Sequence, residues 1–303
     1  MIKVTDIAYV RMGAPDLDRM ESFTRDFGLV TSARDPERLY VRGTDPEPYV
    51  HVTERGEPGL RAVGFEAASA EDLVALSQVE GASAVEKIDA PGGGRRVHLV
   101  DPDGFRVEVV HGRELLAPLP VTGAAPLNRG SQRLRVNALQ RLVAGPSPVK
   151  RLGHAVLRVS DPKRSRMWYS EHFGFLASDD FHAGDPESPL GTFLRCDRGD
   201  VPVDHHTFLC VGPAEPGFDH AAFEVEDIDA VMLGHEQLTQ AGYTHHAGIG
   251  RHFLGSQVFD YWKDPWGHVM EHFTDGDLLD ASIQPGHHPV TIAIGTQWGR
   301  FAG

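Results

Sequence analysis

The chain has 303 residues, 41% hydrophobic and 24% charged, which is the composition of an ordinary globular protein. Its formal net charge of −14 and the lack of a basic run argue against a protein that binds nucleic acid. No stretch approaches the ~18 apolar residues of a membrane helix, and the N-terminus lacks the apolar core of a signal peptide. With only two cysteines, Cys196 and Cys210, these features predict a cytoplasmic location.

The length fits two domains or one large domain, and a Pro- and Gly-rich stretch at 144–148 predicts a boundary. We therefore expect an N-terminal domain over residues 1–143 and a C-terminal domain over residues 149–303, which includes a C-terminal tail. The Arg- and Leu-rich segment 126–143 is predicted to form a connecting helix. Only three of the 17 histidines precede residue 150, so we expect the histidine chemistry in the second domain.

The elements predicted in the first half alternate between strands and helices. In chain order they are a strand over 7–12, a helix from Pro15 to Phe27, a strand over 62–67, a helix start at 70–73, and an Asp-Pro-x-Gly turn at 101–104 that leads to Glu108.

The second half repeats this order. Its elements are a strand over 152–159, a helix over 162–172, a strand over 220–225, a helix start at 226–229, and an Asp-Pro-x-Gly turn at 264–267 that leads to Glu271. Each half thus holds two units of one strand, one helix and several further strands. This repeat predicts an α+β fold with mostly antiparallel sheets.

The two halves differ in the residues that can bind a metal. Alignment of the repeats pairs His154 with Ile7, His220 with Ala62 and Glu271 with Glu108. Two imidazoles and one carboxylate suit Fe(II) with open positions, and a carboxylate also admits Mn(II). A single histidine on a strand is more often structural than a ligand, but three matched positions favour a metal site. The first half lacks the two imidazoles, so we expect it to be a structural copy without a metal.

The clearest motif in the chain surrounds the last of these residues. It runs Gly250-Arg251-His252, then Tyr261, then Asp264-Pro265-Trp266-Gly267, then Glu271. At these residues the sequence resembles the type I extradiol ring-cleaving dioxygenases of the vicinal oxygen chelate superfamily, and the resemblance covers nearly the whole chain. One departure is Asp260, where the family prefers an apolar residue, and we interpret it as variation at a strand position.

The resemblance implies two domains, each of two βαβββ modules, and a role for each motif residue. The metal ligands fall on His154, His220 and Glu271, with Fe(II) as the usual metal and Mn(II) as the alternative. The acid–base histidine falls on a strand and matches His206, although the neighbouring His205 stays open as its competitor. The substrate-binding histidine and tyrosine match His252 and Tyr261.

The implied function is extradiol cleavage of a catechol-type diol, with both atoms of O₂ entering the product. The implied enzyme is similar to catechol 2,3-dioxygenase and 2,3-dihydroxybiphenyl 1,2-dioxygenase, acts in the catabolism of aromatic compounds, and assembles as a homo-oligomer. The alternatives are a hydroquinone-cleaving dioxygenase, another metal-dependent enzyme of the superfamily, and a protein that only binds small aromatics. His252 and Tyr261 favour a catechol-cleaving enzyme, and the full set of metal ligands argues against a protein that only binds aromatics. The ring substituent and the role of the tail stay open.

Overall fold

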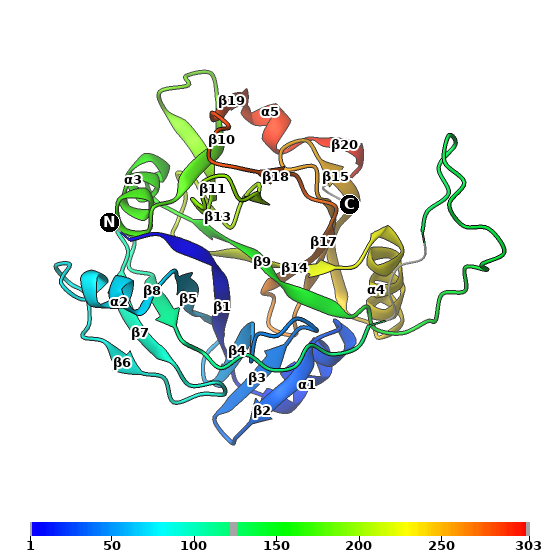
Figure 1. Ribbon diagram of the computed structural model, residues 1–303, viewed down its shortest axis with the longest axis horizontal. Coiled ribbons are helices and arrows are strands. Elements are labelled where there is room, and N and C mark those ends of the chain that lie inside the picture. The colour runs from blue at the N-terminus through cyan, green and yellow to red at the C-terminus, as the bar shows by residue number, and fades with distance from the viewer. Residues whose placement is uncertain (1, 122–125, 301–303) are drawn as a thin grey trace.

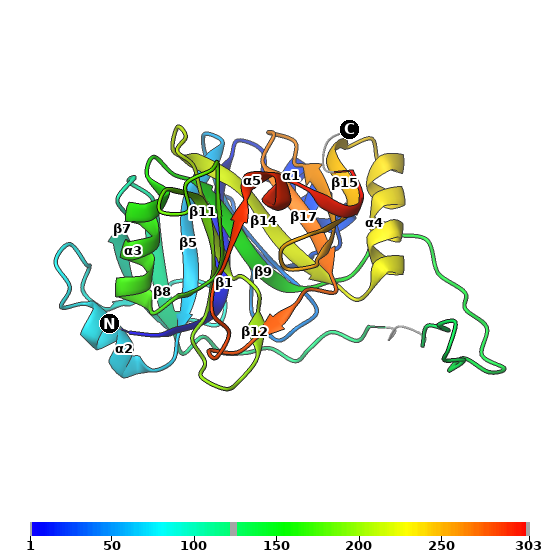
Figure 2. The same ribbon diagram turned by 90° about the horizontal axis from the view of Figure 1, so that it is seen from above.

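The computed structural model describes residues 2–121 and 126–300, and they form two large sheets that pack side by side (Figures 1 and 2). None of the described helices is long and apolar enough to cross a bilayer.

The first sheet is formed by the residues before position 112. Its elements are β1 (Val4–Ala14), α1 (Leu17–Asp26), β2 (Val30–Arg34), β3 (Arg38–Arg42), β4 (His51–Arg55), β5 (Gly59–Ala67), α2 (Ala70–Leu76), β6 (Glu86–Lys87), β7 (Arg95–Val100) and β8 (Arg106–His111). The strands lie in the order β2-β3-β4-β1-β5-β8-β7-β6.

The second sheet is formed by the residues after position 148. Its elements, and those of the small pair beside it, are β9 (Val149–Arg158), α3 (Pro162–Phe173), β10 (Leu176–His182), β11 (Pro189–Arg195), β12 (Val203–Asp204), β13 (Phe208–Val211), β14 (Gly217–Val225), α4 (Ile228–Gln240), β15 (Thr244–His252), β16 (Val258–Lys263), β17 (Val269–Thr274), β18 (Leu278–Leu279), β19 (Gly286–Pro289), α5 (Val290–Ala293) and β20 (Thr296–Gly299). The ten strands lie in the order β19-β10-β11-β13-β9-β14-β17-β16-β15-β20, and β12 pairs with β18.

Each half contains two βαβββ modules joined through one antiparallel pair of first strands. These pairs are β1–β5 in the first half and β9–β14 in the second. Parallel pairing joins the first and last strands of each module, and most other neighbours are antiparallel. The predicted α+β architecture is therefore confirmed.

Short-range signals explain where the helices begin and end. Asp16 caps α1 by accepting hydrogen bonds from the backbone N–H groups of Asp18 and Arg19. Asp161 caps α3 in the same way, and Pro162 occupies its first turn. Gly174 ends α3 in the left-handed conformation, with φ of 73°.

The predicted connecting helix over 126–143 is wrong. This segment contains no helix, and it runs as a loop away from both sheets (Figure 1). Its apolar side chains are exposed, for example Leu139 at 76% and Val143 at 84%. A helix in water depends on burying an apolar face, and the leucines and valines of this segment stay exposed although Gln140 hydrogen-bonds Asp229 of α4.

The two halves share one hydrophobic core, which residues of both sheets enter. Phe27, after α1, meets Phe223 of the second half edge-to-face, with ring centroids 5.6 Å apart. In the reverse direction, Phe173 of α3 packs 6.0 Å from Phe65 of the first half. Strand alternation then decides what faces away from this core: Ala155 and Leu157 of β9 belong to it, so His154 lies on the opposite face.

Candidate metal centre

Three neighbouring strands place the predicted ligand residues together. Ala222 of β14 pairs with His154 of β9 on one side and with Glu271 of β17 on the other. His154 Nε2 lies 3.3 Å from Glu271 Oε2, and His220 Nε2 lies 3.4 Å from the same oxygen. Ligands bound about 2.1 Å from one ion lie roughly 3.0–3.4 Å apart, so this spacing suits a shared metal better than hydrogen bonds.

Burial and missing partners also fit a cation at this point. His154 is 2% exposed, and Glu271 is fully buried. Among the described residues, three atoms at this point have no hydrogen-bond partner: both carboxylate oxygens of Glu271 and the Nε2 atom of His220. A buried carboxylate without hydrogen bonds is costly, and a divalent ion would compensate it.

The charge of Glu271 and the orientation of His220 are both controlled by neighbours. Burial opposes ionisation of Glu271, but His154 and His220 outweigh it and hold the pKa of this carboxyl far below its usual value. His220 Nδ1 lies 2.8 Å from Asp219 Oδ1. An imidazole that donates from Nδ1 to a carboxylate presents Nε2 as the ligand atom. Asp219 was not predicted, although its position directly before His220 was a usable signal.

The two adjacent histidines lie in the bend between β12 and β13, not on a strand as expected. Both are 4% exposed. The His206 ring lies 4.1 Å from the His154 ring, between centroids. His205 contacts His206, and on its other side it contacts Asp179. Its Nδ1 lies 3.1 Å from His206 Nδ1, and its Nε2 lies 2.7 Å from Asp179 Oδ2. Burial holds the pKa of His206 well below its ordinary value.

The histidine and tyrosine of the motif also border the ligand set. His252 Nε2 lies 3.0 Å from the Tyr261 hydroxyl and 4.0 Å from Glu271 Oε1. Tyr261 pairs with Glu271 across β16 and β17, and its ring lies 5.1 Å from that of His220. Burial lowers the pKa of His252 to about 4. The structure thus brings all seven predicted residues into one cluster, in which six are buried and His252 is half-buried.

The C-terminal tail folds back over this side of the second half (Figure 2). β19 pairs with β10, and β20 pairs with β15 through His252 and Thr296. Ile292 of α5 packs on an apolar cluster that contains Phe193, whose ring lies 4.9 Å from that of His206. His288 Nε2 lies 3.0 Å from Asp179 Oδ1, on the far side of His205. No local sequence signal indicated these contacts.

The predicted pairing of His154 with Ile7 of the first half is wrong. Gly64 of β5 pairs with Tyr9 on one side and with Glu108 on the other, just as Ala222 pairs with His154 and Glu271. Tyr9, and not Ile7, therefore stands where the second half has His154. A shift of two residues leaves a side chain on the same face of a strand, so the sequence pattern did not distinguish the two.

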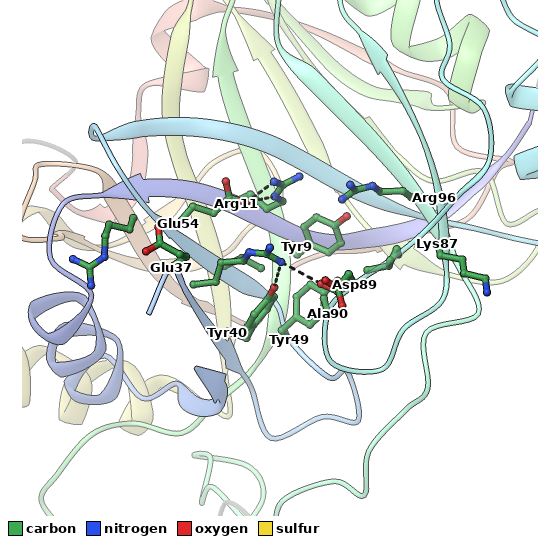
Figure 3. Close-up of a pocket in the computed structure, with 14 residues that line it drawn as sticks. Tyr9, Arg11, Glu37, Tyr40, Tyr49, Glu54, Lys87, Asp89, Ala90 and Arg96 are labelled. Atoms are coloured by element: carbon green, nitrogen blue, oxygen red, sulfur yellow. Dashed lines mark hydrogen bonds and ion pairs between the residues drawn. The ribbon is translucent and has the colours of Figure 1, made fainter. Parts of the chain in front are cut away.

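Glu108 is held by protein cations and a hydroxyl. The Tyr9 hydroxyl donates to Oε2 at 2.6 Å, Arg106 donates to Oε1 at 2.7 Å, and Arg11 donates to Oε1 as well. Above them lies a cleft of about 370 Å³, in which Tyr40 and Arg96 are further lining residues (Figure 3).

Residues 151–272 match the family model of the Glyoxalase/Bleomycin resistance protein/Dioxygenase superfamily. Metapyrocatechase 2 of Cupriavidus necator is 31% identical over 284 residues, which cover 92% of this chain and 83% of that protein. The iron-dependent extradiol dioxygenase of Rhodococcus jostii is 24% identical, over 98% of this chain and 97% of its own length.

Solved structures show the same fold. The Mn(II)-bound glyoxalase of Novosphingobium aromaticivorans superposes with a TM-score of 0.80 and 24% identity, over 98% of this chain and 91% of that one. The 2,3-dioxygenase LapB of Pseudomonas sp. KL28 has a TM-score of 0.78 and 19% identity, over 95% and 98% of the two chains. By its sequence relatives and its fold, this chain belongs to the extradiol dioxygenase family of the vicinal oxygen chelate superfamily.

Proposed function

We propose that this protein is a metal-dependent extradiol dioxygenase that cleaves a catechol-type diol next to its hydroxyl groups, using both atoms of O₂. The observation that carries the proposal is the buried set of His154, His220 and Glu271 with His206 and the His252–Tyr261 pair beside it. Relatives named as metapyrocatechase and biphenyl-2,3-diol 1,2-dioxygenase support the substrate class.

Fe(II) is the proposed metal, and Mn(II) is the alternative. Among the described residues, the oxygens of Glu271 and the Nε2 atom of His220 have no hydrogen-bond partner, and this supports the assignment, as does the iron-dependent relative from Rhodococcus jostii. A divalent ion held by these three residues would supply a Lewis-acidic centre with open positions for a diol and O₂.

His206 is the proposed acid–base group, and its neighbours define which nitrogen acts. Asp179 accepts from Nε2–H of His205, so His205 Nδ1 is left as an acceptor. His206 then donates its Nδ1–H to His205 Nδ1, and this leaves His206 Nε2 as the atom with a lone pair. That nitrogen can take a proton from a substrate hydroxyl and return it later in the reaction.

His252 and Tyr261 are the proposed substrate-orienting pair. Their mutual hydrogen bond at 3.0 Å holds both groups next to Glu271. A hydroxyl and an imidazole in this arrangement can bind one oxygen of a diol and fix its direction. His205 is proposed to hold His206 in place without contacting the substrate.

Three further features stay predictions: the division at 1–143 and 149–303, the cytoplasmic location and the homo-oligomeric state. The exposed leucines and valines of the segment 126–143 support self-association, because apolar surface of this kind is typical of interfaces. Size-exclusion chromatography with light scattering measures the mass in solution, and a monomer at all concentrations would contradict the oligomer.

The test is metal analysis of protein reconstituted anaerobically with Fe(II) or Mn(II), followed by O₂ uptake over a panel of catechols and hydroquinones. We expect one Fe(II) or Mn(II) ion per chain that depends on Glu271, and a yellow ring-opened product from at least one catechol. Uptake with hydroquinones alone would replace the catechol assignment, and metal without any uptake would favour another enzyme of the superfamily. A protein without metal would leave only a binding function.

Two matched variants test the histidine assignment. His206→Phe is expected to keep its metal and to lose most of its turnover, since the proton acceptor is gone. His205→Phe is expected to lose less. The reverse order of activities would transfer the acid–base role to His205.

A further inference from the structure

A second group of metal-ligating side chains lies on the other face of β16. Successive residues of a strand point to opposite faces, so Asp260 points away from the side on which Tyr261 borders Glu271. There Asp260 meets His235 of α4 and His245 of β15, two elements that lie beside each other at the edge of the second half (Figure 2).

The three side chains contact each other directly. Asp260 Oδ1 lies 2.7 Å from His245 Nε2, and Asp260 Oδ2 lies 3.0 Å from His235 Nδ1. The centroids of the two imidazole rings are 5.0 Å apart. Trp262 donates its indole N–H to Oδ2 and so fixes the plane of the carboxylate. One donor atom from each of the three residues lies within 4.8 Å of the others.

Burial differs between the carboxylate and the imidazoles. Asp260 is fully buried, whereas the side chains of His235 and His245 are 30% and 33% exposed. Burial opposes ionisation of Asp260, but hydrogen bonds from His235, His245 and Trp262 outweigh it and hold its pKa below the usual value. A fixed negative charge therefore lies beneath two imidazoles that solvent can reach.

We propose that His235, His245 and Asp260 form a second metal site, which binds a divalent first-row ion of the Zn(II) type. Two imidazoles and one carboxylate are a usual ligand set for zinc, with water in the fourth position. The present contacts of 2.7 and 3.0 Å are hydrogen bonds, so His235 Nδ1 and His245 Nε2 each have to give up the proton that they donate to Asp260, and the contacts widen to roughly 3.0–3.4 Å around an ion. Side-chain rotation of the two part-exposed histidines provides this movement, and the ion enters from solvent between them.

The site does not depend on the proposed dioxygenase activity. Asp260 stands where the resembled family prefers an apolar residue, and a buried carboxylate with two imidazole partners is more than a neutral variation of a strand. Since bound metal competes with protons for the imidazoles, we expect binding to strengthen from pH 6 to pH 8.

The test is titration of metal-free protein with Co(II), a spectroscopic substitute for zinc, in four forms of the full chain. We expect two equivalents bound by the wild type, one by Glu271→Gln, one by Asp260→Asn, and none by the double variant. The visible absorption of four-coordinate Co(II) at the second site is expected to persist in Glu271→Gln and to disappear on addition of Zn(II).

Substitution of the buried Asp260 could prevent folding, so a variant of a part-exposed ligand serves as a second test. His235→Ala removes a part-exposed ligand and is expected to lose the same equivalent, whereas His246→Ala, which removes an exposed neighbouring histidine, is expected to keep it. A Glu271→Gln protein that is folded but binds no Co(II) would overturn the second site. Binding that survives in Glu271→Gln carrying His235→Ala would do the same. A wild type that binds only one equivalent of Co(II), which Glu271→Gln keeps and Asp260→Asn loses, would instead overturn the proposed function.

Discussion

Glu108 and Glu271 occupy equivalent places in the two halves, yet different groups surround them. Each lies on the last strand of its second module, and each is fully buried. Around Glu271 stand His154 and His220, at 3.3 and 3.4 Å, and its oxygens have no hydrogen-bond partner among the described residues. Around Glu108 stand a tyrosine and arginines that donate hydrogen bonds to both oxygens.

A buried carboxylate at this point of the fold requires positive charge nearby, and the two halves differ in where that charge comes from. In the first half Arg11 and Arg106 supply it from the chain itself, because both donate hydrogen bonds directly to Glu108. A Cβ atom at Gly64 would lie 2.7 Å from the ring of Tyr9, so the glycine makes room for the tyrosine. In the second half two short imidazoles leave room for a metal ion.

The largest effect is expected from Glu271→Gln. We expect loss of the ion that His154, His220 and Glu271 hold, with turnover lower by roughly a thousand-fold or more, because that ion contributes several kcal/mol of transition-state stabilisation. Metal analysis and O₂ uptake measure both quantities. Glu108→Gln is the matched control and is expected to keep its metal and its turnover. Metal loss in that variant would contradict the claim that the first half holds no ion.

Glu108→Ala is expected to act on stability instead of metal content. It leaves Arg11 and Arg106 without their shared partner, and we expect the free energy of unfolding to fall by about 3 kcal/mol. Urea unfolding of the metal-free protein measures the change. An unchanged urea concentration at the midpoint would show that other groups compensate the charge of these arginines.

The first half also contains a buried imidazole, His51. Its Nδ1 atom has no hydrogen-bond partner among the described residues. Burial lowers its pKa to about 4, below the value of about 6.5 in the unfolded chain. The unfolded state therefore binds more protons between these values, and the contribution to stability is complete above pH 6.5 and is lost as the pH falls toward 4.

For this residue we expect a loss of about 2 kcal/mol between pH 7.5 and pH 5. His51→Leu removes the titrating group, so its stability is expected to depend less on pH by that amount. Urea unfolding at both pH values makes the comparison, and equal slopes for variant and wild type would contradict the assignment.

The smallest effect is expected from Tyr9→Phe, compared with Tyr261→Phe. Tyr9→Phe removes the hydrogen bond to Glu108 and is expected to cost about 1.5 kcal/mol of stability without a change in turnover. Tyr261→Phe is expected to lower turnover, because its hydroxyl is proposed to orient substrate. If Tyr9→Phe reduced O₂ uptake while the protein remained folded, the first half would have a role in the reaction.

Much of this molecule was predictable from local patterns. The Asp caps at Asp16 and Asp161 and the two Asp-Pro-x-Gly turns mark element boundaries through contacts between residues close in the chain. The repeat of these patterns predicted the α+β modules and placed His154, His220 and Glu271 at corresponding positions. These patterns were readable because each depends on only a few neighbouring residues.

The tertiary structure decided what depends on distant partners. It placed Tyr9 and Glu108 on either side of Gly64, where a shift of two residues had been indistinguishable, and it left 126–143 without a surface on which a helix could form. It also brought His235 from a helix to Asp260 on a strand and folded the tail across β15. Strand register, burial and contacts between distant segments arise only when the sheets pack, so no local pattern of the chain contains them.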